Sequence, residues 1–105
     1  METNRIYGLM KLLREKPHMA LMDHESLSSL INYINGYELS LLDVSSNNEN
    51  LLTISEWLSR QVNSKFSSSW WAYLLQKYDG SEPDAREAML DVFESYLNYI
   101  SKVTS

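Results

Sequence analysis

Apolar residues recur along most of this chain at intervals of three and four positions, the spacing that places side chains on one face of an α-helix. In the first segment, Ile6, Met10 and Leu13 follow this spacing. The clearest apolar face belongs to the last segment and comprises Ala85, Met89, Val92, Phe93, Tyr96 and Ile100. Helices are predicted over roughly residues 3–16, 24–43, 53–65, 70–79 and 82–100. The expected fold class is therefore all-α, a single compact domain of about five or more helices.

Residues with known preferences for helix ends support these boundaries. Pro17 follows the first helix, as expected because the residue before a proline avoids helical backbone angles. Thr53 stands three residues before Glu56, and this pair predicts a capping box at the start of the third helix. Gly80 suits a left-handed position at the end of the fourth helix. Pro83 fits the first turn of the fifth helix, where a missing N–H does no harm.

The segments between these helices are polar or irregular. Residues 17–23 are expected to form a connector that packs Met19, Leu21 or Met22 inward, with Asp23 as N-cap of the second helix. Residues 44–50 read as a polar loop. One of the serines at 67–69 is expected to cap the fourth helix.

Two residues of the second helix stand out against its apolar face, which comprises Leu27, Ile31, Ile34 and Leu41. Gly36 lies inside the helix, where glycine costs about 1 kcal/mol relative to alanine, so we expect another helix to cross closely there. Glu38 projects toward the apolar face. Three explanations are open: the helix bends at Gly36, or Glu38 lies at the margin of the face and pairs with Arg14 or Arg60, or it is a partly buried charge held for a partner's Arg or Lys.

The length and composition indicate one domain covering residues 1–105. Cysteine is absent, which excludes disulfides and thiolate chemistry and fits a reducing compartment. The first residues lack the pattern of a signal peptide, and no stretch approaches the roughly 20 apolar residues of a spanning helix. A cytoplasmic location without membrane association is therefore expected.

The charge is unevenly distributed along the chain, which carries a formal net charge of −5. Basic residues crowd the first helix, at Arg5, Lys11, Arg14 and Lys16. Two acidic blocks follow: Asp23, Glu25, Glu38, Asp43, Glu49 and Glu56, and then Asp79, Glu82, Asp84, Glu87, Asp91 and Glu94. Their intervals of four and three place Glu87, Asp91 and Glu94 on the polar side of the fifth helix, as a solvent-facing ridge. Such a ridge either keeps the protein soluble or docks a basic partner.

No arrangement of residues indicates catalysis or a bound cofactor. His18 and His24 are six positions apart, which does not suit a helical metal pair. The sequence has no serine-nucleophile motif and no glycine-rich phosphate loop. Nucleic-acid binding is disfavoured because phosphate contacts need a broad basic patch. We therefore expect a protein that is not an enzyme and binds no metal, cofactor or nucleic acid.

The aromatic residues divide into a predicted core set and a predicted surface set. Trp70, Trp71, Leu74, Leu75 and Tyr78 share one arc of the fourth helix and are expected to pack in the core. Tyr7, Tyr33, Tyr73 and Tyr99 are candidate exposed aromatics. Tyr73 is the candidate aromatic anchor for a partner, because tyrosine is enriched at protein interfaces.

The order of several features over about residues 14–97 resembles a group of small helical bacterial proteins. The pattern residues are Lys16, Pro17, Met19, Ser26, Leu27, Gly36, Tyr37, Trp57, Trp71, Gly80, Ser81 and Glu82. Some members of this group are similar to immunity proteins of contact-dependent growth inhibition systems. Where the group has a tyrosine and a glycine after the methionine, this chain has Ala20 and Leu21. The resemblance implies a small helical fold and a protein toxin as partner.

Charge and resemblance together predict an immunity protein that binds a cognate toxin, a basic nuclease, as a 1:1 heterodimer. Its acidic surface would cover the active site of the toxin, with carboxylates in the place of substrate phosphates. The candidate partner-binding residues are Glu38, Asp43, Glu49, Tyr73, Asp79, Glu82, Glu87, Asp91 and Glu94. An alternative is a helical adaptor or regulator that acts through homodimerisation, and a third is a small hydrolase working through carboxylates.

Overall fold

The computed structural model describes residues 2–16, 27–44, 51–63, 65 and 69–104. Its helices are α1 (Glu2–Glu15), α2 (Leu27–Val44), α3 (Ile54–Gln61), α4 (Trp70–Lys77) and α5 (Glu82–Thr104). No strand occurs in these ranges. The all-α prediction is confirmed, and the described part of the chain forms one compact globule of five helices. The predicted connector at residues 17–23, the Asp23 cap, both histidines and most of the polar loop lie outside the described residues.

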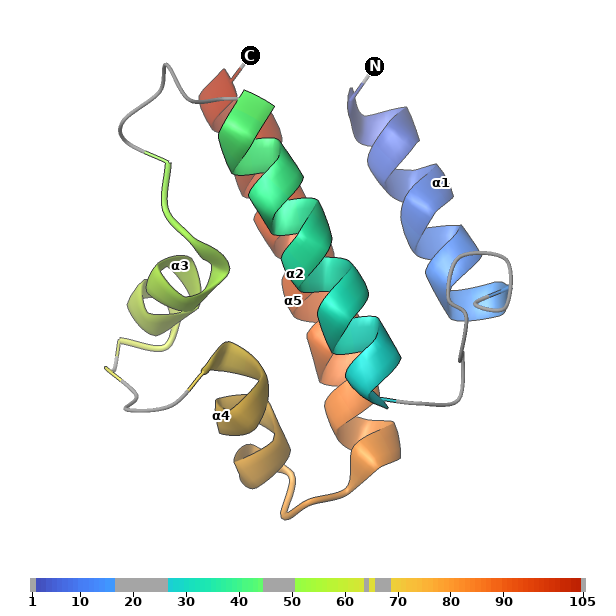
Figure 1. Cartoon of the computed structure of the whole chain (residues 1–105), viewed down its shortest axis with the longest axis vertical. Helices are drawn as coiled ribbons and strands as arrows, with labels where there is room; N and C mark the ends of the chain where they lie inside the picture. The colour runs from blue at the N-terminus through green and yellow to red at the C-terminus, as the bar shows by residue number, and fades with distance from the viewer. Residues whose placement is uncertain (1, 17–26, 45–50, 64, 66–68, 105) are drawn as a thin grey trace.

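The longest helix, α5, is the axis on which the other four pack. In Figure 1, α2 lies in front of α5 and runs along it in the same direction, while α1 flanks the pair on one side and runs the opposite way. The short helices α3 and α4 flank it on the other side. The principal extents of 37 × 33 × 19 Å describe a flat arrangement. Because helices pack on both sides of α5, its buried surface is wide.

The core confirms the predicted apolar face of α5 and extends it. Five of its six predicted members are buried, while Val92 is half-buried and packs at the margin. Leu90 and Leu97 are also buried, although they lie outside the predicted stripe. They are covered because α5 has helices on more than one side, whereas a single amphipathic stripe describes a helix packed on one side only.

The predicted capping box of α3 is present. The Thr53 Oγ1 accepts a hydrogen bond from the Glu56 backbone N–H at 3.2 Å, and the Thr53 N–H donates to Glu56 Oε1 at 3.2 Å. The helix ends at Gln61, earlier than the predicted end near Lys65. Asn63, at φ 53°, takes the left-handed conformation that follows the end of α3. Asparagine tolerates this conformation, so it ends a helix without a glycine.

The turn from α4 to α5 contains two successive left-handed residues, Asp79 at φ 54° and Gly80 at φ 80°. The Asp79 N–H donates to the Gln76 carbonyl at 3.0 Å, and the Gly80 N–H donates to the Leu75 carbonyl at 2.9 Å. This pair of bonds is a Schellman motif, which satisfies the free carbonyls at the end of α4. The predicted glycine stop is therefore confirmed, with Asp79 sharing the left-handed turn.

Gly36 does not mark a close helix crossing, so that prediction is wrong. The residue is exposed, and a Cβ built on it meets no heavy atom within 4 Å. It lies on the solvent side of α2, which packs its buried residues Leu30 and Ile34 toward α5. Glycine at this position therefore weakens the helix without a packing reason in the described residues.

Candidate partner-binding surface

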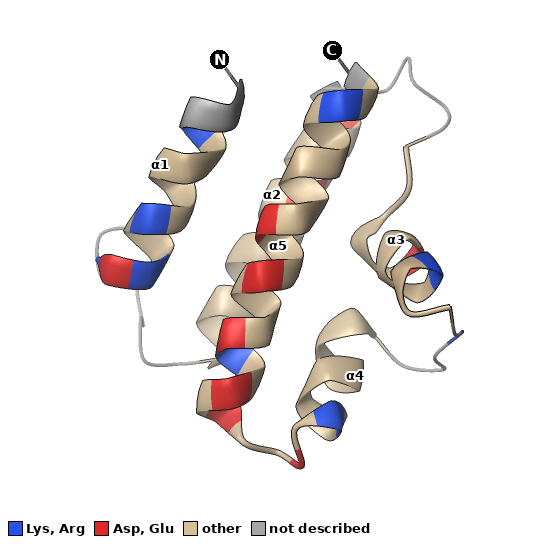
Figure 2. Ribbon diagram, turned by 180° about the vertical axis from the view of Figure 1, so that it is seen from behind, with Lys and Arg blue, Asp and Glu red and all other residues tan. Residues whose placement is uncertain are grey.

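The predicted acidic ridge on α5 (Glu87, Asp91 and Glu94) is present, but it is not free. One guanidinium, that of Arg14 in the last turn of α1, contacts all three carboxylates. Arg14 Nη1 donates to Glu87 Oε2 at 3.1 Å, and Nη2 donates to Asp91 Oδ1 at 2.9 Å and to Glu94 Oε1 at 3.2 Å. Figure 2 shows the acidic residues along α5 and the basic residues along the neighbouring α1.

The spacing of the ridge explains why one side chain reaches three partners. Residues four and three positions apart stack on one helix face, so their carboxylates form a row. The planar guanidinium offers five N–H donors in a rigid fork, which suits contacts to neighbouring carboxylates. The contacts raise the pKa of Arg14 above its ordinary value. The hydrogen bond to Asp91 is the largest cause, while partial burial acts in the opposite direction.

The ridge carboxylates stay open to solvent around this contact. The side chains of Glu87, Asp91 and Glu94 are 67%, 71% and 41% exposed, whereas that of Arg14 is 29% exposed. One positive charge against three negative charges leaves the group with a net negative charge. The ridge can therefore still attract a cation from outside.

Glu38 pairs with neither Arg14 nor Arg60, so the predicted ion pair is wrong. Its Oε2 instead accepts a hydrogen bond from the Ile54 backbone N–H, which lies in the first turn of α3. Helix N-termini carry unpaired N–H groups and partial positive charge, which favours a carboxylate there. Burial raises the pKa of Glu38, and the bond from Ile54 partly opposes that rise. This carboxylate thus serves to connect α2 with α3.

Two tyrosine hydroxyls of α5 bind the backbone of the segment before α3. The Tyr96 hydroxyl donates to the Leu52 carbonyl at 2.7 Å, and the Tyr99 hydroxyl accepts from the Leu52 N–H at 3.0 Å. Burial, and then the negative charge of Glu38, raise the pKa of Tyr96 well above its ordinary value. Both backbone groups of Leu52 are therefore satisfied by side chains of α5.

The predicted set of exposed tyrosines is correct for Tyr7 alone. Tyr33, Tyr73 and Tyr99 are partly buried and pack against the core. Tyr73 belongs to α4, which packs against both α3 and α5. It is therefore a less accessible anchor than the helical arc of α4 predicts.

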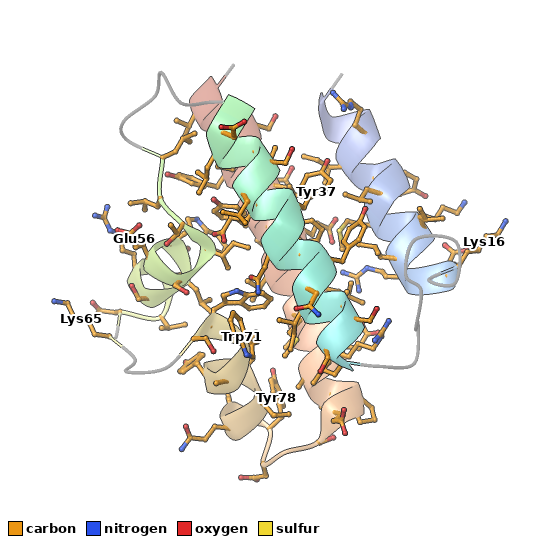
Figure 3. All side chains as sticks on the ribbon, in the orientation of Figure 1. Lys16, Tyr37, Glu56, Lys65, Trp71 and Tyr78 are labelled. Atoms are coloured by element: carbon orange, nitrogen blue, oxygen red, sulfur yellow. The ribbon has the colours of Figure 1, made fainter. Side chains whose placement is uncertain are left out.

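The predicted core arc of α4 is correct in its centre and wrong at its end. Trp70 and Leu74 are buried, and the Trp70 indole N–H donates to Asn35 Oδ1 at 3.1 Å. Trp71, labelled in Figure 3, is partly buried and meets Trp70 edge to face at 5.7 Å between ring centroids. Tyr78, the C-cap residue of α4, is exposed.

The remaining acidic candidates occupy two ends of the molecule. Asp79 and Glu82 are exposed at the turn that leads into α5, next to the ridge along the chain. Asp43 is exposed near the far end of α2, which lies beside the C-terminal end of α5 in Figure 1. Glu49 lies outside the described residues. The structure therefore groups Asp79 and Glu82 with the ridge end of α5, and it separates Glu38 and Asp43 from them.

The contact of Arg14 with the ridge and the buried position of Arg86 were not predicted from the sequence. Arg86 lies on α5 among the acidic residues, yet its Nη2 is buried without a hydrogen-bond partner among the described residues. It lines a cavity of about 320 Å³ together with Leu27, Glu82 and Pro83. The crowding of basic residues on the first helix was the one available signal for Arg14, since its partners are 73 to 80 positions away.

The described residues offer no sign of a metal site or a membrane span. Among them, no group of three or more His, Cys, Asp or Glu side chains could hold a metal ion. None of the described helices is long and apolar enough to cross a bilayer. Comparison with known proteins finds no matching family model, no matching curated protein and no matching solved structure.

Proposed function

We propose that this chain is an immunity protein that binds a basic protein toxin in the cytoplasm and covers its active site. The working surface is the ridge of α5 together with Asp79 and Glu82 at the turn before it. The toxin belongs to the nuclease class, whose substrate-binding groups are Lys and Arg side chains. Carboxylates of the ridge take the place of substrate phosphates, and one chain neutralises one toxin molecule.

The observation that carries this proposal is the seating of a guanidinium on the ridge. Arg14 reaches the three carboxylates at 2.9 to 3.2 Å, which is the distance expected of charge-assisted hydrogen bonds. The ridge thus has the spacing that an arginine needs. Net negative charge supports the same partner, because opposite potentials accelerate encounter and exclude wrong partners.

Growth rescue tests the proposal. The gene directly upstream should encode a toxin with a variable C-terminal domain, and co-expression of this chain should restore growth of cells that produce that domain. Glu82→Lys should abolish rescue. Glu82 is exposed and lies outside the Arg14 contacts, and the left-handed Asp79 is left unchanged, so the fold should remain intact.

Asp43→Lys, at the far end of α2, is the matched control and should keep rescue. Rescue that survives reversal at both ends would contradict an electrostatic mechanism. Failure of the unaltered chain to rescue growth would contradict the immunity function itself.

Exposed apolar residues favour one second candidate, an adaptor that acts as a homodimer. Tyr7 on α1 is 65% exposed and Leu39 on α2 is 69% exposed. Exposed large apolar side chains are a feature of interfaces when they form a patch. This candidate predicts that the isolated chain self-associates with rising concentration, which sedimentation equilibrium measures. A chain that stays monomeric until a toxin is added favours the immunity function.

A further inference from the structure

The contact between Arg14 and the acidic ridge has an unusual composition. One cation serves three anions, and both of its terminal nitrogens are used: Nη1 on Glu87, and Nη2 on Asp91 and Glu94. A surface ion pair between one Lys or Arg and one carboxylate contributes little to stability, so its side chains can separate at small cost. Because the ridge keeps an excess of negative charge, an arginine from outside would be attracted to the same three carboxylates.

The docking of α1 does not depend on this contact alone. Ile6, Met10 and Leu13 bury their side chains in the core, and Arg14 lies at the margin of this apolar face, toward α5. This apolar anchor is the non-polar face predicted from the sequence. Arg14 is a long side chain with several rotatable bonds, so its guanidinium can leave the ridge while α1 stays in place.

We propose that Arg14 is an internal competitor for the acidic ridge. It occupies the carboxylates that an arginine of the basic partner would contact, and it swings aside when the partner binds. This inference rests on the proposed function, because it concerns regulation of the same surface. Its effect is to lower the affinity of the free protein for stray cationic surfaces, since a partner must displace Arg14 before it gains the contact.

The experiment uses a fluorescein-labelled hexa-arginine peptide as the probe, with binding to the full chain followed by fluorescence anisotropy at low salt. Arg14→Gln should bind the peptide about tenfold more tightly than the unaltered chain, because three carboxylates are released for the probe. Lys11→Gln removes the same charge from the same helix. Lys11 is exposed and does not contact the ridge, so the affinity of Lys11→Gln for the peptide should differ less than about twofold from that of the unaltered chain.

A second pair of variants separates competition from a general change of charge. In a background with Glu87→Gln, Asp91→Asn and Glu94→Gln, Arg14→Gln should change the affinity no more than Lys11→Gln does. Arg14→Lys keeps the charge but loses the fork, and it should tighten binding by an intermediate factor. Circular dichroism should show that all variants keep their helical content.

Equal effects of Arg14→Gln and Lys11→Gln would overturn the inference, as would weaker peptide binding by Arg14→Gln. The inference would also be overturned if, in the background without the ridge carboxylates, Arg14→Gln still bound the peptide more tightly than Lys11→Gln. Growth rescue is read separately. If the peptide result holds and no toxin is neutralised, the competition stands and the immunity function fails. If rescue holds and the two variants are equal, the immunity function stands and the competition fails.

Discussion

The carboxylate of Glu38, on α2, accepts a hydrogen bond from the backbone N–H of Ile54, in the first turn of α3. The two residues are separated by 16 positions, and the bond joins two helices through one side chain. A half-buried carboxylate that meets a helix N-terminus is stabilised there by the N–H and by the partial positive charge of the helix end. Burial nevertheless raises its pKa, because desolvation outweighs the bond.

This balance predicts a pH dependence of stability. The pKa of Glu38 in the folded chain lies above its ordinary value, so the folded state binds its proton more tightly than the unfolded state does. The stabilisation from this group is therefore fully present below the unfolded pKa and is lost as the pH rises through the folded pKa. Glu38→Gln keeps an acceptor oxygen and does not titrate.

Urea unfolding of the unaltered chain and of Glu38→Gln, measured from acidic to neutral pH, checks this prediction. The free energy of unfolding of the unaltered chain, relative to Glu38→Gln, should be highest in acid and should fall toward neutral pH. The comparison between the two chains cancels the other carboxylates. A difference that rises with pH would mean that the Ile54 bond outweighs burial.

Gly36 should respond favourably to replacement by alanine. It is an exposed interior position of α2, and an added Cβ meets no heavy atom within 4 Å. Gly36→Ala is expected to raise the free energy of unfolding by about 0.5 to 1 kcal/mol, because alanine restricts the unfolded chain and favours the helix.

Gly80→Ala is the matched control in thermal and urea unfolding. Gly80 has φ 80°, a conformation in which a Cβ is strained. This replacement should destabilise the chain by about 1 to 2 kcal/mol. A loss of stability in Gly36→Ala would show that the glycine has a packing role after all.

Much of the helical architecture could be predicted from the sequence because its signals are local. The Thr53 and Glu56 capping box, the stop before Pro17 and the left-handed turn at Gly80 depend on residues only a few positions apart. The 3.6-residue period of the apolar residues in α5 likewise predicted most of its buried face. Each of these signals is a property of a short segment, so it does not require knowledge of the packing.

The tertiary contacts of the candidate surface were not predictable in the same way. Arg14 is separated from Glu87 by 73 positions, and nothing local to either residue places α1 beside α5. An ion pair of Glu38 with Arg14 or Arg60 was one prediction from the sequence. The hydrogen-bond donor to Glu38 is instead a backbone N–H, a group that almost any residue provides. The predicted exposure of Tyr33, Tyr73 and Tyr99 is wrong because helical periodicity does not indicate which neighbouring elements cover the margins of a helix face.

Replacement of Arg86 by an uncharged residue of similar length should stabilise the fold. Within the part of the chain that the structure describes, the Nη2 of Arg86 is buried without a hydrogen-bond partner, and such a group costs desolvation free energy without a compensating bond. Arg86→Met keeps the long apolar stem and removes the buried nitrogen. It is expected to raise the free energy of unfolding by about 1 kcal/mol.

Arg60→Met provides the control, since Arg60 is exposed on α3. Its effect on urea unfolding should stay within about 0.5 kcal/mol. A clear loss of stability in Arg86→Met, with no loss in Arg60→Met, would show that the guanidinium of Arg86 stabilises the fold.

Binding of a basic protein by the acidic ridge and turn of α5 should depend strongly on salt. The association rate of this chain with the toxin domain encoded beside it can be followed by stopped-flow fluorescence from about 50 mM to about 1 M salt. The rate should fall at least about tenfold over this range, because salt screens the attraction between opposite charges. An association rate and a dissociation constant that stay the same in molar salt would contradict this mode of binding.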